Sequence, residues 1–188
     1  MKLSKVGALC KGAKRFVIYK TWSGQWISDG YAIYPIRELP PLQEDNVYAL
    51  FDIPEDKRGK VQYEEKNVPY GINLNDGCDD EVVVQIAPIS IVYHGSIITP
   101  IKGRGGILYI DRKYLSPLGD DITLYERYYP RDDRSYIVAK RGLLLEGVIL
   151  PAEIATKELA KTLKHIGELT ELVAGDEDFE PEQEEMDV

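Results

Sequence analysis

SDGYAIYPIR, at residues 28–37, aligns without a gap with YHGSIITPIK at residues 93–102. The two stretches are 93 − 28 = 65 residues apart, and they share a glycine, an isoleucine, a Pro-Ile pair and a basic last residue. Going backwards at the same spacing, Val17-Ile18 falls on Val82-Val83 and Trp26-Ile27 on Ile91-Val92. Such a repeat predicts either one domain built from two related units or two similar hairpins.

The segments around the repeat are rich in strand residues and are separated by turn formers. Residues 15–21 and 25–36 predict one hairpin, and residues 122–129 and 135–141 predict another. Residues 143–150 are the most apolar of these runs, so we expect this strand to be central in its sheet.

Helices are predicted at both ends of the chain. Residues 3–12 have apolar side chains at helical spacing and end at a glycine. Residues 153–173 predict a longer helix, whose apolar stripe consists of Leu159, Leu163, Ile166 and Leu169. The predicted fold class is therefore α+β, with a mostly antiparallel sheet, short helices and one long C-terminal helix. The repeat adds the expectation of an internally duplicated domain.

Charge separates the body of the chain from its end. The net charge of the 188 residues is −9, and residues 176–188 contain eight acidic residues and no base, which leaves −9 + 8 = −1 for the body. We expect this acidic tail to be disordered. Residues 1–175 are expected to form a single α+β domain, with half-units at 1–66 and 81–150 and a closing helix at 153–173.

Composition argues against several classes of protein. No apolar run approaches the roughly 20 residues that cross a bilayer, and the start of the chain does not resemble a secretory signal. We therefore expect a cytoplasmic protein without a membrane partner. Cys10 and Cys78 form no CxxC pair and there are only two histidines, so neither a metal nor another cofactor is expected.

Basic residues at helical spacing are the first candidate site. Lys157, Lys161 and Lys164 share one face of the predicted C-terminal helix. The first helix and its exit carry a second set of bases, which includes Lys2, Lys5, Lys11, Lys14 and Arg15. Two basic faces on a nearly neutral body could contact phosphates, and ordinary solvated helix faces are the alternative interpretation.

The acidic tail allows three interpretations. It could simply keep the protein soluble. It could dock on a basic partner through Phe179, the aromatic residue within DEDFEPEQ. It could also compete with nucleic acid for the protein's own basic face.

Asp29 and His94 occupy equivalent places in the repeat, each directly before a glycine. A general base or a metal ligand at these positions is one hypothesis, and turn residues are the other. No serine or cysteine nucleophile with recognisable partners accompanies them. The glycine-rich KGRGG at residues 102–106 lies between two strand-like runs, which indicates a hairpin turn and not a phosphate-binding loop.

One resemblance to a known family rests on residues 3–36, LSKVGALCKGAKRFVIYKTWSGQWISDGYAIYPI, and residues 136–150, YIVAKRGLLLEGVIL. A helix, a strand, a turn and a strand ending in Asp-Gly, duplicated along the chain, resembles the half-domains of DNA sliding clamps. The resemblance implies helices that face DNA, and it assigns DNA contact to Lys11, Lys14, Arg15, Lys157, Lys161 and Lys164. The chain departs from that pattern before Glu81, where the second unit lacks a leading helix.

These observations lead to three expectations about function. The first is a non-enzymatic accessory protein of phage or prophage DNA metabolism, because the chain is also similar in general style to uncharacterised prophage-encoded proteins of Gram-positive bacteria. The second is an enzyme of unknown class with a site near Asp29 and His94. The third is a protein-interaction or inhibitor module that uses the acidic tail.

Overall fold

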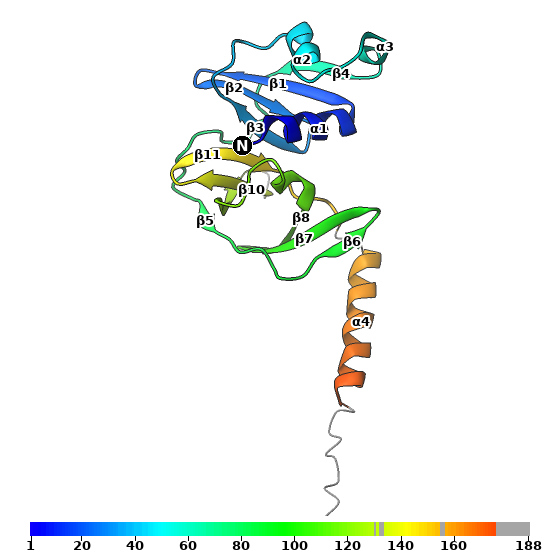
Figure 1. The fold of residues 1–188 in the computed structure, drawn as a ribbon. Coiled ribbons are helices and arrows are strands. Elements are labelled where there is room, and N and C mark those ends of the chain that lie inside the picture. Colours follow the sequence, from blue (N-terminus) through cyan, green and yellow to red (C-terminus); the bar gives the residue numbers. More distant parts are fainter. Residues whose placement is uncertain (130, 132–133, 155–156, 176–188) are drawn as a thin grey trace, which may run out of the picture. The chain divides into compact units, whose positions relative to one another are not determined.

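The computed structural model describes residues 1–129, 131, 134–154 and 157–175. Contacts between residues divide the chain into two compact units, Met1–Ala152 and Glu153–Val188. The first unit holds the strands and short helices, and the described part of the second holds α4 (Lys157–Gly175) (Figure 1). α4 thus begins at Lys157 and not at Glu153 as predicted. Phe179 and the predicted disordered tail lie outside the described residues.

Eight strands of the first unit form one sheet in the order β4-β1-β2-β3-β11-β10-β9-β5 (Figure 1). Neighbouring strands are antiparallel except for β1 and β4, which run parallel. The sheet is therefore mostly antiparallel, as predicted, but its one parallel pair makes it mixed and not purely antiparallel. The strands are β1 (Arg15–Thr21), β2 (Gly24–Ser28), β3 (Ala32–Ile36), β4 (Gln62–Lys66), β5 (Val82–Val83), β9 (Thr123–Tyr129), β10 (Arg134–Arg141) and β11 (Leu144–Ile149).

The parallel pair arises from a crossover that local sequence patterns do not encode. After β3 the chain passes through α2 (Glu44–Leu50) and α3 (Glu55–Arg58), and it then enters β4 beside β1. Two parallel neighbouring strands require a long connection of this kind. The antiparallel pairs β1–β2 and β2–β3 need only tight turns.

A second, three-stranded antiparallel sheet contains β6 (Ile91–Tyr93), β7 (Ser96–Gly103) and β8 (Gly106–Asp111). At the 65-residue spacing β2 and β3 correspond to β6 and β7, and both pairs form antiparallel hairpins, which confirms two similar hairpins. The correspondence ends there, because β1 pairs with β2 whereas its counterpart β5 pairs with β9. The predicted half-units 1–66 and 81–150 do not have equivalent strand pairing. Their similarity is local, since each contains a turn whose glycine has a positive φ, 101° at Gly30 and 80° at Gly95.

A different correspondence lies at the centre of the large sheet. β3 pairs with β11 through Ile33↔Val148 and Ala32↔Ile149. One meander, β1-β2-β3, lies on one side of this contact, and the other, β9-β10-β11, lies on the opposite side. Each meander follows a helical segment, α1 (Leu3–Ala13) or the 3₁₀ turn η1 (Arg112–Leu115). The central place predicted for residues 143–150 is confirmed by β11.

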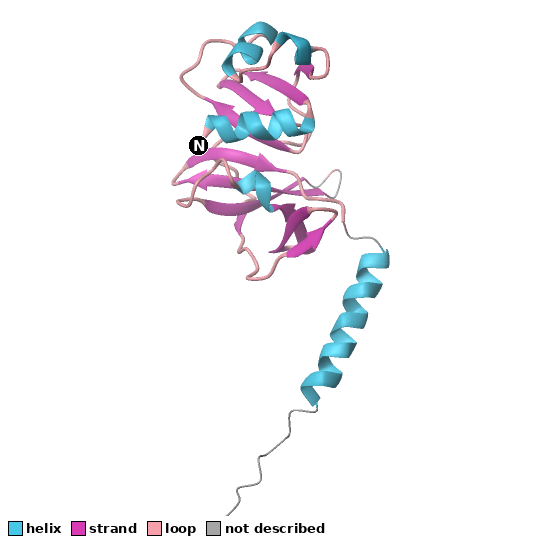
Figure 2. Cartoon of the chain, turned by 45° about the vertical axis from the view of Figure 1, so that its right-hand side comes forward, coloured by secondary structure: helices cyan, strands magenta, loops and turns pink. Residues whose placement is uncertain are grey.

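Both faces of the large sheet are covered. Alternate residues of β1 show this, because Phe16 and Ile18 belong to one buried cluster and Val17 and Tyr19 to another. α1 and η1 lie on the first face (Figure 2). The connection that contains Val68, Ile72 and Leu74 packs on the second face.

A buried arginine holds that connection in place. Arg127 of β9 is fully buried and donates to the carbonyl oxygens of Asn73, Asn75 and Asp76 at 2.8–3.2 Å. It also pairs with Glu81 at 2.8 Å, and Lys140 of β10 pairs with the same carboxylate at 2.5 Å. The buried guanidinium is thereby satisfied by backbone oxygens and by a carboxylate.

Candidate nucleic-acid interface

The exposed side of α1 is basic. The chain up to Ser28 contains six bases and no acid, and the first acidic residue is Asp29. The opposite side of α1 packs on the sheet through Val6, Gly7 and Cys10, which are buried. Four lysines, two within α1 and one directly before and after it, are exposed to solvent: Lys2, Lys5, Lys11 and Lys14.

The three predicted site residues at the end of α1 differ in their partners. Lys11 Nζ donates to the Phe51 carbonyl oxygen at 2.8 Å, so its charge is not cancelled by an acid. Lys14 caps α1 in the left-handed conformation (φ 53°) and is exposed. Arg15 forms an ion pair with Glu64 at 2.8 Å, and this hydrogen-bonded partner raises the pKa of the guanidinium. Arg15 is therefore largely neutralised, whereas Lys11 and Lys14 are not.

η1 adds two bases that the sequence did not identify as site residues. Arg112 and Lys113 are exposed on this turn, which begins where the Asp111 carboxylate accepts the Lys113 backbone N–H at 3.1 Å. Lys113 Nζ forms an ion pair with the same carboxylate at 2.9 Å. Among the residues that the structure describes, Arg112 has no carboxylate partner. The sequence Asp-Arg-Lys, in which Asp111 caps a short helix that starts with two bases, is the signal that could have identified Arg112 and Lys113 as site residues.

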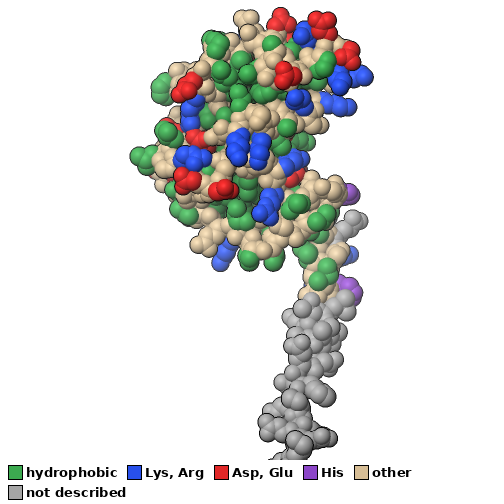
Figure 3. All heavy atoms as spheres, in the orientation of Figure 1, with side chains coloured by type: hydrophobic (Ala, Val, Ile, Leu, Met, Phe, Trp, Pro, Cys, Tyr) green, Lys and Arg blue, Asp and Glu red, His purple; other side chains and the backbone are tan. Residues whose placement is uncertain are grey.

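α1 and η1 lie side by side on one face of the sheet (Figures 1 and 2). The Lys2 backbone N–H donates to the Pro117 carbonyl oxygen at 2.7 Å, which ties the start of α1 to the chain just after η1. Lys and Arg side chains are visible over both elements in Figure 3.

An exposed aromatic residue accompanies these bases. Tyr31, on the turn between β2 and β3, is 61% exposed. Its ring stacks on that of Tyr114 in η1, with centroids 6.4 Å apart, and Lys113 Nζ lies 4.9 Å from the centroid of the Tyr114 ring. We name this surface the α1–η1 face; it consists of Lys2, Lys5, Lys11, Lys14, Tyr31, Arg112 and Lys113.

The remaining predicted bases belong to the second unit. Lys157, Lys161 and Lys164 of α4 are exposed, and Lys164 lies 3.8 Å from Glu168 one turn later. The predicted DNA-contacting residues are thus divided between two units, with Lys11, Lys14 and Arg15 in the first.

Asp29 and His94 have separate environments. Asp29 is buried, and its Oδ1 accepts the backbone N–H groups of Tyr31 and Ala32 at 2.9 and 3.0 Å. His94 is exposed on the turn between β6 and β7, in the other sheet, with its ring 4.3 Å from that of Tyr93. Each side chain therefore has the setting of a turn residue, and the structure gives no contact between the two.

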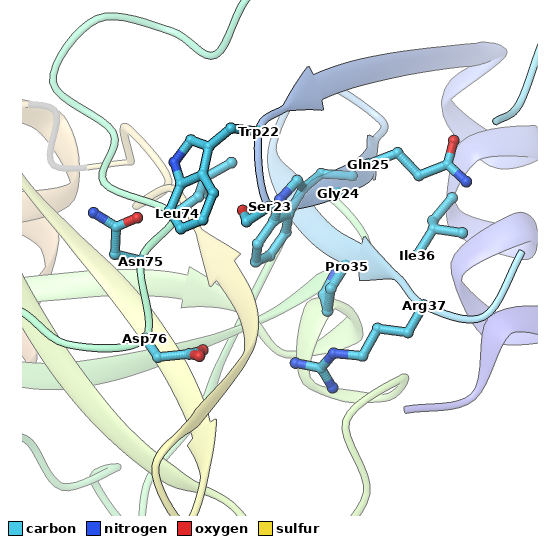
Figure 4. A pocket seen from close by; sticks show the side chains of 11 residues that line it. Trp22, Ser23, Gly24, Gln25, Pro35, Ile36, Arg37, Leu74, Asn75 and Asp76 are labelled. Carbon is cyan, nitrogen blue, oxygen red and sulfur yellow. The ribbon is translucent and has the colours of Figure 1, made fainter. Parts of the chain in front are cut away.

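A hollow of about 370 Å³ lies at the opposite end of the β1–β2 hairpin (Figure 4). Trp22 stands at its edge and is 92% exposed. Trp26, Pro35 and Leu74 supply apolar lining, and the side chains of Arg37 and Asp76 point toward each other across the hollow. Arg37 is held by Glu146 and by the Leu145 carbonyl oxygen.

Other kinds of site find little support in the described part of the chain. It contains no group of three or more His, Cys, Asp and Glu side chains that could hold a metal ion. Burial raises the pKa of the Cys10 thiol well above its ordinary range. No helix within the described ranges is both long and apolar enough to span a membrane.

No family model, curated protein sequence or solved structure matches the chain significantly.

Proposed function

We propose that this protein is a nucleic-acid accessory protein that contacts phosphates through the α1–η1 face. The observation that carries the proposal is the gathering of cations from two distant segments on one face. Within the described residues, no carboxylate pairs with Lys2, Lys5, Lys14 or Arg112. Cations that are not already neutralised can release the counterions of a nucleic acid, which is the main source of non-specific affinity.

The dimensions of the face suit this role. The 11 residues of α1 extend about 16 Å. Duplex DNA carries one charge per about 1.7 Å of its axis, so a helix of this length can reach several phosphates. Lys113 and Arg15 contribute less, because Asp111 and Glu64 already pair with them.

The resemblance to sliding-clamp half-domains gives the proposal its biological setting. Two three-stranded meanders, each preceded by a helical segment on the same face, fit an internally duplicated, clamp-like domain. η1 departs from this pattern, because it has four residues where α1 has 11. We retain phage or prophage DNA metabolism as the proposed context, with the lysine face of α4 as a second contact.

Charge reversal tests the proposal directly. Binding of labelled DNA at low salt should weaken at least tenfold in the triple variant Lys5→Glu/Lys14→Glu/Arg112→Glu. The matched control is Lys57→Glu/Lys60→Glu/Lys102→Glu, which makes the same charge change at exposed lysines outside the face. Equal loss in both variants, or no binding by the wild type, would refute phosphate contact through this face.

The helix α4 needs a separate test. Lys157→Glu/Lys161→Glu/Lys164→Glu leaves the first unit intact. A loss of affinity comparable to that of the α1–η1 triple variant would assign α4 to the interface. Unchanged affinity would restrict the interface to the α1–η1 face.

A second candidate function, docking of a protein partner, is favoured by the Trp22 hollow. Trp22, Leu143 and Leu144 are 92%, 84% and 52% exposed, on turns or strand starts at the same end of the sheet. Exposed apolar groups that cluster in this way are typical of interaction sites. A purified partner identified by cross-linking should bind the wild type and not Trp22→Ala. Equal binding of the two proteins would exclude this surface.

Docking through Phe179 stays a prediction from the sequence, and Phe179→Ala tests it in the same assay.

A further inference from the structure

We propose that the α1–η1 face prefers single-stranded nucleic acid, with Tyr31 as the residue on which an unpaired base stacks. This inference rests on the proposed function and adds the class of nucleic acid. Aromatic side chains beside a cationic surface bind single strands because every base has a π face. In a duplex those faces are occupied by neighbouring base pairs, so an exposed tyrosine ring gains nothing from them.

The ring of Tyr31 is available for stacking. It is 61% exposed, although its neighbours Gly30 and Ala32 are half-buried and buried. One side of the ring faces Tyr114, at an interplanar angle of 27°. Tyr114 itself is only 5% exposed, so it supports Tyr31 from the protein side and leaves the outer side to solvent.

The backbone that carries Tyr31 is fixed in place. Its N–H donates to Asp29 Oδ1 at 2.9 Å, and its carbonyl oxygen accepts the Leu150 N–H at 2.9 Å. The preceding Gly30 has a φ of 101° and donates its N–H to Ser28 Oγ at 2.9 Å. A ring held on a fixed turn loses little conformational entropy when it binds, which favours affinity.

The supporting tyrosine is fixed as well. Its carbonyl oxygen accepts the hydroxyl of Tyr34 at 2.7 Å. Burial, together with the nearby Asp29 carboxylate, raises the pKa of Tyr114 well above its ordinary range, so its ring remains neutral. The supporting ring therefore adds no negative charge that would repel phosphates.

Two cations lie close to this pair of rings. Lys113 Nζ lies 4.9 Å from the centroid of the Tyr114 ring. Arg15 lies close to Gly30, the residue before Tyr31. A Cβ atom added at Gly30 would lie 3.0 Å from Arg15 Nη1. Lys14 directly precedes Arg15 and is exposed. Because Asp111 and Glu64 already pair with Lys113 and Arg15, the flanking phosphates of a base on Tyr31 would depend mainly on Lys14 for positive charge.

Fluorescence anisotropy with labelled dT20 and with a 20-base-pair duplex tests the inference on the full chain. We expect dT20 to bind more tightly than the duplex. Tyr31→Ala should weaken dT20 binding about 5- to 150-fold, the range for loss of one base–aromatic stack, and leave duplex affinity unchanged. Tyr31→Phe keeps the ring and should retain the wild-type affinity.

The matched control is Tyr70→Ala, because Tyr70 is 71% exposed and belongs to the connection on the other face of the sheet. It should bind dT20 like the wild type. If Tyr31→Ala melts like the wild type and binds dT20 with unchanged affinity, the role of Tyr31 is overturned. Phosphate contact by the α1–η1 face would still stand in that case, provided that Lys5→Glu/Lys14→Glu/Arg112→Glu weakens binding. Equal affinity of the wild type for dT20 and duplex would overturn the preference. Absence of binding to either would overturn the proposed function itself.

Discussion

Arg127 and Glu81 form an ion pair of 2.8 Å between strand β9 and the end of the connection that crosses the second face of the sheet. The guanidinium side chain is 1% exposed and the carboxylate side chain 14%. Because the same guanidinium also binds three backbone carbonyl oxygens, Arg127 anchors the 73–81 segment to β9.

Removal of Arg127 should therefore be strongly destabilising. Arg127→Met leaves the Glu81 carboxylate with Lys140 alone and three carbonyl oxygens without this donor, so we expect a loss of about 3–5 kcal/mol in the free energy of unfolding. Urea denaturation measures it. Lys20→Met, which removes an exposed pair with Glu65, is the control and should cost less than about 1 kcal/mol. Similar losses in the two variants would contradict the anchoring role of Arg127.

Glu81 should also make stability depend on pH. Burial acts to raise its pKa, but hydrogen bonds from Lys140 and Arg127 outweigh burial, and the pKa is lowered in the folded state. A lowered folded-state pKa means that the stabilisation is present above the ordinary value of about 4.3 and is lost as the pH falls through the folded-state value. Unfolding free energies measured from pH 7 to pH 3 should fall less steeply for Glu81→Gln than for the wild type. Parallel curves would show that Glu81 does not carry this dependence.

Much of the fold could be predicted from local sequence. Strand residues separated by Ser23-Gly24 predicted the β1–β2 hairpin, and the apolar run at residues 143–150 predicted the central strand β11. The parallel β1–β4 pair could not be predicted in this way, because it depends on a crossover through α2 and α3. The 65-residue repeat identified two similar hairpins, β2–β3 and β6–β7, but not two equivalent half-units, because the two hairpins belong to different sheets.

The candidate site was predictable only in part. Lys11 and Lys14 follow from helical spacing, because they lie on one element. Tyr31 and Tyr114 are 114 − 31 = 83 residues apart, and their rings stack because η1 lies against the turn between β2 and β3. Sequence alone does not establish such long-range pairing, so the aromatic part of the α1–η1 face became visible only in the structure.

Two glycines of α1 should respond oppositely to substitution by alanine. A Cβ atom at Gly7 would lie 2.2 Å from Phe51 Cδ1, so Gly7→Ala should force the helix or the ring to shift and cost about 1–3 kcal/mol. At Gly12 nothing lies within 4 Å of an added Cβ atom, and Gly12→Ala should stabilise the helix by about 0.5–1 kcal/mol. Thermal melting of both variants tests the close packing of α1 against Phe51, and a stabilised Gly7→Ala would contradict it.

The salt dependence of binding reports how many phosphates the α1–η1 face binds. Removing one cation that binds a phosphate should reduce the slope of log K against log salt by about 0.7 with single-stranded DNA and about 0.9 with duplex. We expect this reduction in Lys14→Ala and in Arg112→Ala, whereas Arg15→Ala should change the slope less because Glu64 already pairs with the guanidinium. Lys102→Ala, on β7, should leave the slope unchanged. Slopes that do not differ between Lys14→Ala, Arg112→Ala and Lys102→Ala would show that the α1–η1 face does not touch phosphates, even if Tyr31→Ala weakens binding.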